Sequence, residues 1–491
     1  MKRAGHITAL AALTLFITAL PLRAFRPEGQ ALIYANFSFI NYIATSQKHV
    51  YFATTGGIVV YNKIELRWET PLTGAGGIDS DNADRIWVDR FDQHLYAQTQ
   101  GGLWEYDFVF KRWSSLPELP SIDSDDKHVA PPPTMFAPFG YNYVGTGNLV
   151  DPHGRTFRIT DMVDDGAGNL WIGTWALGAA TADAAGLVIA LLPYGLLQNP
   201  AYALLDEDSL LWVAGPMLGS PRTGVTGFDR ANNRFLWVES GAGVDFPAVD
   251  VNCLAGDKAN LYLGTVGGLL VMDRATLRVS SRVDKRRGLT DQNILSMATV
   301  GDSIFLGTSN GLLLLYHGLD SVVYIGQREF YNRIIYDLLP VDNALWIGSG
   351  VGAYRFFLDD NRLQKFQDPD QVLFNRVFDI DRAGRDLWLA SDGGMVRIDL
   401  DSGGTEPFRT LSRKLDSRAL AASDQMVAAA SDFGVTVTFF NDGKPYQREF
   451  GVEDGLPSRY VYALLLDGDY LWIGTDRGLC HFWWNNPRRI D

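Results

Sequence analysis

A phrase of the form Leu-Trp-Ile-Gly-Thr recurs along the chain, and this repetition constrains the fold more than any other feature. The phrase stands at residues 170–174 and again at 471–475. Related phrases bring the total to ten copies, whose second core position is held by Tyr51, Tyr96, Trp171, Trp212, Tyr262, Phe305, Trp346, Trp388, Val427 and Trp472. Eight of the nine spacings between these positions are 39 to 50 residues, and the spacing from 96 to 171 is 75. A repeat of this length indicates one supersecondary unit per copy.

Each copy has the composition of a small antiparallel sheet. An alternating apolar run is followed by a polar turn, the phrase itself, a Gly-containing turn, a third apolar run and a weaker fourth run. This pattern predicts a four-stranded sheet per copy, and repeated sheets of this kind predict an all-β β-propeller of about ten blades. We expect the aromatic residue to fill the wedge between blades and the Gly to admit the next blade closely.

The recurring Trp, Gly and Asp are therefore interpreted as packing and turn residues. The run DDGAGN at 164–169 lacks the spaced ligands and distal Glu of a known calcium loop, so we interpret it as a hairpin turn. No pair of histidines has metal-ligand spacing. The sequence predicts neither a metal site nor a cofactor.

Composition narrows the class of protein. The chain of 491 residues is 46% hydrophobic and 20% charged, which is typical of globular proteins. Its formal charge of −14 argues against nucleic acid as a partner, because nucleic-acid binding needs a basic face. Cys253 and Cys480 lie in apolar runs far apart in the sequence, and we interpret them as buried free thiols rather than a disulfide.

The N-terminus has the pattern of an export signal. Lys2 and Arg3 precede an apolar run over residues 8–22, which predicts a signal peptide over 1–24 and a propeller over 25–491. An uncleaved anchor is the alternative. No later stretch reaches membrane-spanning length, so we expect a periplasmic or secreted protein with no membrane span after signal removal.

The ends of the chain suggest how the propeller closes. The last copy ends at GLCHFWWNN without a fourth strand, whereas ALIYANF at 31–37 is a strand without a blade. We expect this N-terminal strand to complete the last blade and close a single ring, although two smaller rings remain an alternative. The long spacing carries an insertion at about 114–157, which we interpret as a proline-stiffened arm and a hairpin, serving as a lid or an ornament.

The runs DGAGNLWIGTWALG and DYLWIGTDRGL resemble the two-component regulator propeller repeat. This resemblance extends over nearly the whole chain after the signal, with degenerate copies at 49, 94, 210 and 425. It implies a periplasmic ligand-binding sensor propeller of bacteria. Sensor kinases of this family add a membrane span and a histidine kinase, and neither is present in this sequence. We therefore expect any output to pass through a separate protein partner in trans.

A ligand is expected on the face where the innermost strands begin. Six of the ten copies have an arginine at this point and one has an asparagine: Arg85, Arg158, Asn293, Arg333, Arg376, Arg418 and Arg459. Loops between the second and third strands add Trp175, Asp476 and Arg477 to the same face. Such an arginine collar would attract an anionic small molecule or glycan. Alternatively, each arginine pairs with an acidic neighbour such as Asp337, Asp379 or Asp416 and ties blade to blade.

Two classes of function follow. The first is a non-catalytic recognition module that binds a small molecule, glycan or protein around the central channel. The second is a secreted polysaccharide hydrolase or lyase acting at the channel mouth. The sequence has no G-x-S-x-G elbow and no phosphate loop, and His153 in the turn-like DPHGR is an isolated candidate base. We favour the first class, and a buried carboxylate pair or a His–Asp contact on the binding face would favour the second.

Overall fold

The computed structural model describes residues 31–486 except 75–76, 125, 146, 208, 219, 242–245, 317–320, 369, 374, 409–418 and 441–444. The expected signal peptide therefore lies outside the described residues. Strands dominate and form ten antiparallel sheets, nine of four strands and one of seven. The all-β propeller fold with ten blades is confirmed. Among the residues described, no helix has the length and apolar character needed to cross a membrane.

Seven sheets are built from the C-terminal part of the chain, and each begins with its innermost strand. Their strands are β17 Ala203–Glu207, β18 Leu210–Ala214, β19 Gly224–Asp229, β20 Arg234–Glu239, β21 Val251–Gly256, β22 Asn260–Thr265, β23 Gly268–Asp273, β24 Arg278–Val283, β25 Ile294–Val300, β26 Ser303–Thr308, β27 Gly311–Tyr316, β28 Ser321–Ile325, β29 Ile335–Val341, β30 Ala344–Ser349, β31 Gly352–Phe357, β32 Leu363–Lys365, β33 Val377–Ala383, β34 Asp386–Ser391, β35 Gly394–Asp399, β36 Thr405–Phe408, β37 Leu420–Ala422, β38 Met426–Ser431, β39 Gly434–Phe439, β40 Tyr446–Phe450, β41 Val461–Asp467, β42 Tyr470–Thr475 and β43 Gly478–Trp483. A short helix, α1 Gln327–Phe330, and 3-10 turns at Lys285–Arg287 and Val452–Asp454 join some of them.

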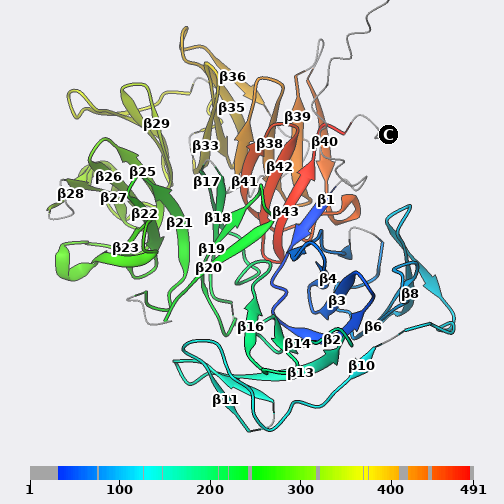
Figure 1. Ribbon diagram of the computed structural model, residues 1–491. Coiled ribbons are helices and arrows are strands. Elements are labelled where there is room, and N and C mark those ends of the chain that lie inside the picture. The colour runs from blue at the N-terminus through cyan, green and yellow to red at the C-terminus, as the bar shows by residue number, and fades with distance from the viewer. Residues whose placement is uncertain are drawn as a thin grey trace, which may run out of the picture.

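These seven sheets form a closed ring. Neighbouring innermost strands pack in chain order from β17 to β41, and β41 packs in turn against β17. The last sheet takes its outermost strand from the N-terminus, since β1 (Ala31–Tyr34) pairs antiparallel with β43. The expectation that the N-terminal strand completes the last blade is confirmed. We call this unit the seven-sheet ring (Figure 1).

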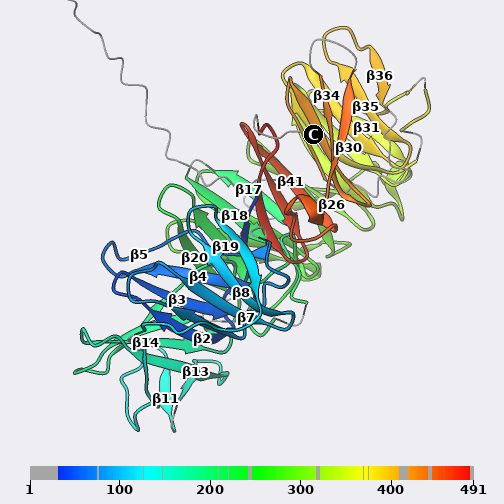
Figure 2. The same ribbon diagram turned by 90° about the vertical axis from the view of Figure 1, so that its right-hand side faces the viewer.

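The other three sheets form a separate unit inserted in sequence between β1 and β17. Their strands are β2 Ile40–Thr45, β3 His49–Thr54, β4 Gly57–Asn62, β5 Arg67–Trp68, β6 Arg85–Val88, β7 Leu95–Thr99, β8 Gly102–Asp107, β9 Arg112–Leu116, β10 Lys127–His128, β11 Asn142–Val144, β12 Asn148–Val150, β13 Thr156–Asp164, β14 Asn169–Thr174, β15 Ala179–Asp183 and β16 Ile189–Leu192. The innermost strand β2 packs against β6 on one side and β13 on the other. Figures 1 and 2 show this three-sheet arc lying beside the ring.

The expectation of a single ring of ten blades is therefore wrong, although the ten sheets themselves are correct. Once seven sheets have stacked, the aromatic face of the last sheet meets the first: Trp472 packs with Leu211 and Val213 of β18. The remaining three sheets have no place in that ring. Sheet number and wedge contacts, neither of which appears in the repeat itself, decide the closure.

The order of sheets in the arc is that of an interrupted ring. In the ring, the second core position of the phrase faces the sheet that follows in sequence, as Trp212 faces β22. In the arc, Tyr51 likewise faces the second sheet. Trp171 of the third sheet faces back to the first, where its ring lies 5.5 Å from that of Tyr61. The three sheets thus follow the order third, first, second, and the gap falls between the second and third sheets, where the 75-residue spacing occurs.

The insertion covers one side of this gap. Met135, Leu149 and Phe157 pack on Leu170 and Ile172 of the third sheet, on the flank that a preceding blade would otherwise cover. The strands β11 and β12 form a hairpin that extends the sheet from β13, and β10 pairs with β13 at its other end. The apolar flank of the third sheet is thereby removed from water.

Local hydrogen bonds explain the recurring residues of the phrase. The indole nitrogen of the Trp donates to the hairpin acid that precedes it, from Trp171 to Asp165 at 3.0 Å and from Trp472 to Asp467 at 3.1 Å. The Thr hydroxyl donates to a carbonyl in the following turn, as Thr475 does to Gly478 at 2.8 Å. The repeated Asp, Trp, Thr and Gly thus close hairpins and pack sheets.

One copy of the phrase is offset by a residue from its expected register. Val427 packs toward the preceding sheet with Trp388, whereas its neighbour Ala428 packs toward the following sheet. The second core position of this copy is therefore Ala428, and the aromatic residue is absent there. The Ala-rich run 428–430 hides the register in the sequence because its residues are nearly equivalent.

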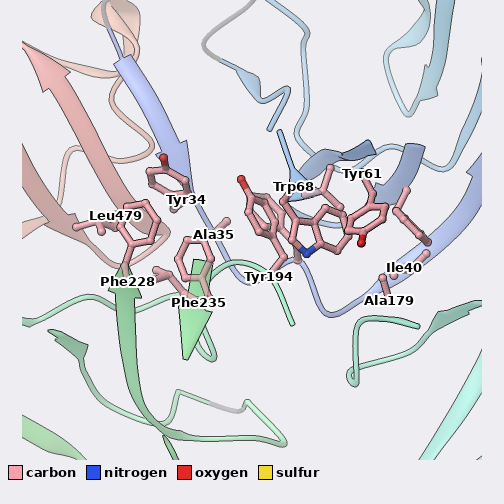
Figure 3. Packing of buried hydrophobic residues seen from close by; sticks show 14 of the residues in the cluster. Tyr34, Ala35, Ile40, Tyr61, Trp68, Ala179, Tyr194, Phe228, Phe235 and Leu479 are labelled. Atoms are coloured by element: carbon pink, nitrogen blue, oxygen red, sulfur yellow. The ribbon is translucent and has the colours of Figure 1, made fainter. Parts of the chain in front are cut away.

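An aromatic cluster joins the ring to the arc (Figure 3). Tyr194, in the connection from β16 to β17, packs its ring 4.7 Å from Trp68 of the arc and 5.1 Å from Phe235 of the ring. The hydroxyl of Tyr194 donates to the carbonyl of Glu69 at 2.9 Å. The two connecting segments also bond to each other, from the Leu196 amide to the Ala35 carbonyl at 2.9 Å. This buried contact fixes how the two units sit together.

A buried ion network forms a second contact between the units. Arg222 donates to Glu239 at 2.8 and 3.0 Å, and both residues are at most 9% exposed. Arg155, in the turn of the insertion, donates to the other oxygen of Glu239 at 2.5 Å and to Asp151 at 2.6 Å. His153 in this turn donates its backbone amide to Asp151. The DPHGR turn therefore takes part in a structural ion network.

Candidate functional site

The ring has one face at which every innermost strand begins, and we call it the mouth face. Six of the residues expected to bind a ligand belong to this face: Asn293, Arg333, Arg376, Arg459, Asp476 and Arg477. Asn293 and Arg376 directly precede β25 and β33, whereas Arg333 and Arg459 stand two residues before β29 and β41. Asp476 and Arg477 form the turn between β42 and β43. The ring therefore brings together more than half of the expected residues.

Arg333 and Arg459 of the mouth face are exposed and, like the exposed Arg477, carry no ion pair among the residues described. Arg333 lies just before β29, with its backbone amide bonded to the carbonyl of Phe330 at 3.0 Å. Arg459 donates to the hydroxyl of its neighbour Tyr460 at 2.8 Å and lies over that ring at 4.9 Å. Both guanidinium groups keep donors that can bind a carboxylate or sulfate.

Arg376 is held differently. Its guanidinium donates twice to Asp392 in the next turn of the same sheet, both times at 2.9 Å. This fork neutralises the charge that the collar hypothesis requires at this position. Asn293 is also engaged, because its side-chain oxygen accepts from Asn252 of the preceding sheet at 3.1 Å.

The turn 476–477 adds one carboxylate and one guanidinium. The Oδ1 atom of Asp476 is buried without a hydrogen-bond partner among the described residues. Arg477 donates its backbone amide to Thr475 at 3.1 Å. The guanidinium of Arg477 favours ionisation of Asp81 in the arc, although burial outweighs this and raises the pKa of Asp81. The arc thus approaches the mouth face at this turn.

Three expected residues belong to the arc instead. Arg85 lies in β6 with its guanidinium 5.0 Å from the ring of Tyr42. Arg158 lies within β13, and Trp175, which follows β14, packs its ring 5.2 Å from Phe39 while staying 46% exposed. Arg418 lies outside the described residues. The structure therefore does not bring the arginines into one collar, because ring and arc have separate axes.

The arginines also differ in register. Arg333 and Arg459 stand two residues before their strands begin, whereas Arg376 stands one residue before and Arg85 lies inside its strand. A shift of one residue turns a side chain to the opposite face of a strand. Arginines at nearly equivalent positions in the repeat therefore do not point in equivalent directions in the structure.

Acidic residues of the innermost strands bond to backbone amides and not to the arginines that the sequence suggested as their partners. Asp337 accepts from the amide of Ile380 at 3.0 Å, Asp379 from Leu420 at 2.5 Å and Asp381 from Ala422 at 2.7 Å. Each carboxylate thus bonds the backbone of the following sheet rather than an arginine. In the arc, Asp161 does the same for Ile43 at 2.9 Å. For Asp337 and Asp379, the position two residues after the first strand residue was the available signal.

Asp337 and Asp379 lie side by side, and their environment alters their ionisation. Burial raises the pKa of Asp379 well above the ordinary carboxyl value, and the neighbouring Asp337 and Asp381 raise it further. Burial also raises the pKa of Asp337, and it raises that of Asp381 to about 6. Because two adjacent buried carboxylates repel, the pair holds a proton more tightly than an ordinary carboxyl group does.

A His–Asp contact occurs in the arc. Nδ1 of His128 lies 2.8 Å from Asp161, and this bond raises the pKa of His128 above its usual value. The histidine comes from the insertion, and its ring lies 4.6 Å from that of Tyr42 in a tilted arrangement. Within the described ranges, no group of three or more His, Cys, Asp or Glu side chains could hold a metal ion.

Comparison with known proteins identifies the repeat. The family described as "Two component regulator propeller" matches residues 455–477. A search of curated proteins found no match. The solved structures described next have only 11% to 15% sequence identity to this chain, so any likeness to them concerns the fold alone.

Three solved structures illustrate the likeness. PorZ, a bacterial surface component of the type-IX secretion system of Porphyromonas gingivalis, has 15% identity and a TM-score of 0.48, covering 90% of this chain and 68% of its own. The extracellular domain of the putative one component system BT4673 from B. thetaiotaomicron has 15% identity and a TM-score of 0.44, covering 92% and 70%. The WD40 propeller of Doa1 has 11% identity and a TM-score of 0.43, covering 59% and 94%. This chain is thus a β-propeller protein that carries the two-component regulator propeller repeat.

Proposed function

We propose that the protein is an exported, non-catalytic recognition module whose seven-sheet ring binds an anionic small molecule or glycan at the mouth face and acts through a separate protein partner. The observation that carries this proposal is the pair Arg333 and Arg459, which are exposed at the mouth and form no ion pair with a described residue, although Asp432 favours the charge of Arg459. A guanidinium without a counter-ion, next to aromatic surface such as Tyr460, suits a carboxylate- or sulfate-bearing ligand.

The pattern of bonding around the repeat supports the same proposal. The Trp, Asp, Thr and Gly of each phrase are used in hairpins and sheet packing, so they are not available for a ligand. The side chains at the mouth differ from sheet to sheet, from Asn293 to Arg333 to Arg376. A regular scaffold with a variable rim is the usual arrangement of a binding propeller.

The alternative, a polysaccharide hydrolase or lyase, draws on the carboxyl pair Asp337 and Asp379. These carboxylates accept backbone amides of neighbouring sheets, as Asp337 accepts Ile380 and Asp379 accepts Leu420. Their lone pairs are therefore engaged in holding sheets together. The contact between His128 and Asp161 belongs to the arc rather than to the mouth face. Both observations favour recognition over catalysis.

A thermal-shift screen against uronic acids and sulfated sugars tests the proposal. We expect a ligand-dependent rise in melting temperature that Arg333→Ala and Arg459→Ala each reduce, because each removes a donor to the anion. Arg158→Ala in the arc is the matched control and should leave the shift unchanged. Absence of any shift, or a shift indifferent to both mouth variants, would reject the site. Release of reducing ends from a polysaccharide would favour the hydrolase.

A further inference from the structure

One segment of the ring is strongly basic in an otherwise acidic protein. Residues 278–287 read RVSSRVDKRR and contain five basic residues and one acidic residue, although the chain carries a formal charge of −14. The basic residues are Arg278, Arg282, Lys285, Arg286 and Arg287, and all five are exposed. They occupy β24 and the 3-10 turn that follows it. We call this segment the basic edge.

Most of these charges have no acidic partner among the residues described. Arg282 lies 3.5 Å from Asp284, and Arg287 donates to the hydroxyl of Ser281 at 2.9 Å. Arg278, Lys285 and Arg286 make no ion pair with any described residue. Clustered like charges repel one another, so the segment lowers the stability of the free protein unless an anion approaches.

The fold does not require basic residues here. The turn Val452–Asp454 occupies the equivalent place between β40 and β41, and both turns are 3-10 turns closed by a glycine with positive φ, 95° at Gly288 and 101° at Gly455. The second turn carries Glu453 and Asp454 where the first has Arg286 and Arg287. The same geometry thus tolerates opposite charge, and the basic character of 285–287 is independent of folding.

A groove of about 560 Å³ runs along this segment. It is lined by Val279, Ser280, Ser281 and Arg282 of β24, with Pro247 and Arg287 beside them. The strand has a β-bulge here, since Val271 pairs with Ser281 and Met272 with Val279. Ser280 therefore has no partner across the ladder, and four consecutive residues, 279–282, reach the groove. The strand β24 is the outermost of its sheet and pairs on one side with β23. No strand that the structure describes pairs with its other side.

We propose that the basic edge docks an extended acidic segment of a partner protein, which adds as a strand to β24. The backbone of that segment would pair with the free edge, while its Asp or Glu side chains meet Arg278, Arg282 and Arg287. Basic residues on an edge repel other basic edges and select an acidic one. This docking surface lies on the outermost strand, and its turn Lys285–Arg287 leads into β25 at the rim of the mouth face. The proposal does not depend on the proposed mouth ligand.

The groove favours a peptide over other anions. A membrane surface would need the charges alone, and a free glycan has no backbone amides to pair with an edge strand. The combination of an edge strand that no described strand other than β23 pairs with and two exposed arginines, Arg278 and Arg282, on either side of the bulge at Ser280 fits addition of a short extended segment. The other polyanions become outcomes of the test.

Fluorescence anisotropy with the full chain tests the proposal. The probe is a dye-labelled peptide of about ten residues in which Glu alternates with Val, as strand geometry requires. We expect binding that Arg278→Glu with Arg282→Glu weakens by about tenfold or more, and that added salt weakens. The matched control is Lys365→Glu on β32, the outermost strand of another sheet, which should leave the affinity unchanged.

Two peptides N-methylated on alternate backbone amides separate strand addition from charge attraction. One set of amides faces the edge, so we expect one peptide to lose binding and the other to retain it. Hydrogen exchange should also slow at residues 279–282 in the complex. The proposal would be overturned if both methylated peptides bound equally or if the double variant kept the parent's affinity. It would also be overturned if heparin or anionic phosphatidylglycerol vesicles bound tightly while the peptide did not bind.

Discussion

The ring and the arc are built from the same repeat, yet one closes and the other does not. In nine of the ten sheets, the position after the third core residue of the phrase is Gly or Ala, as in Gly173, Gly264 and Gly307. A Cβ on Gly173 would lie 2.6 Å from Ile40, and one on Gly307 would lie 2.7 Å from Ile335, because the following sheet presses against this point. The remaining sheet, the second of the arc, has Gln98 there.

Gln98 marks the place where the succession of sheets stops. Its side chain turns to the local hairpin, where it donates to the carbonyls of Thr99 and Gly102 at 2.9 and 3.0 Å. No sheet approaches this flank in the part of the chain that the structure describes. The comparison teaches that the repeat determines the shape of each blade. The residue at the contact point is small where another blade packs against it and large, as Gln98 is, where none does.

The largest effect is expected from opening the ring. Ile33→Asp places a carboxylate in β1, at a side chain only 4% exposed and packed beside Cys480 and Phe482. We expect a loss of about 4 kcal/mol in the free energy of unfolding, since an unpaired charge is buried at the closing strand. Urea denaturation followed by tryptophan fluorescence measures this loss.

Its counterpart in the arc is Leu103→Asp. Leu103 pairs across β7 and β8 with Gln98 and so lies on the flank that no sheet covers. We expect less than about 1 kcal/mol of destabilisation at this exposed flank. A similar loss for both variants would contradict the distinction between a closed ring and an open arc.

The next largest effect on stability is expected from exchanging the residues at the sheet-to-sheet contact point, Gly264 in the ring and Gln98 in the arc. Gly264→Gln forces a side chain against Ile294, whose methyl group would lie 2.8 Å from the new Cβ. We expect a loss of about 3 kcal/mol from overpacking. The reciprocal Gln98→Gly should cost less than about 1 kcal/mol, through backbone entropy and two hairpin bonds. Calorimetry of both variants compares the two positions, and equal losses would refute the assignment of Gln98 to an open flank.

The stability of the arc should depend on pH through the ionisation of His49. Burial alone would lower the pKa of His49, but its hydrogen bonds to Asp92 at 3.0 Å and Glu69 at 3.2 Å outweigh this and raise it to about 9. Since the folded pKa exceeds the unfolded value of about 6.5, the stabilisation is complete below pH ~6.5 and is lost as the pH rises through about 9.

We expect this stabilisation to be about 1 to 2 kcal/mol once solvent screening is considered. His49→Gln should remove the loss of stability between pH 7 and 10. Denaturation of both proteins across this range measures it. A variant that retains the full pH dependence would show that His49 is not its source.

The smallest effect is expected in the ring, from the carboxyl pair. Burial and the neighbouring carboxylates hold the pKa of Asp379 well above the ordinary value, so its contribution to stability is present at low pH and is lost as the pH rises through the folded pKa. Asp379→Asn keeps a neutral group and should stabilise the protein by about 1 kcal/mol at alkaline pH. Thermal denaturation at pH 5 and at pH 9 should separate the variant from the parent only at the higher value.

The same comparison defines what could be predicted about the site. Arg333, Arg376 and Arg459 lie where the ring's innermost strands begin, as their position in the sequence predicts. The spacing of the repeats could not show that Arg376 pairs with Asp392. It also could not show that Arg85 and Arg158 belong to the arc. These outcomes depend on register within a strand and on which sheets share an axis. The basic edge was visible in the sequence, but its position beside a free strand was not.

The sequence by itself determined the unit of construction: a hairpin acid, an aromatic residue, a small residue and a hydroxyl at fixed spacing produce one sheet, because their bonds lie within that sheet. It also determined that β1 completes the last sheet, since an unpaired strand and an incomplete blade stand at opposite ends of the chain. Only the tertiary structure decided that seven sheets close and three remain as an arc. Closure is a property of wedge angles summed around an axis, and no single copy of the repeat contains that sum.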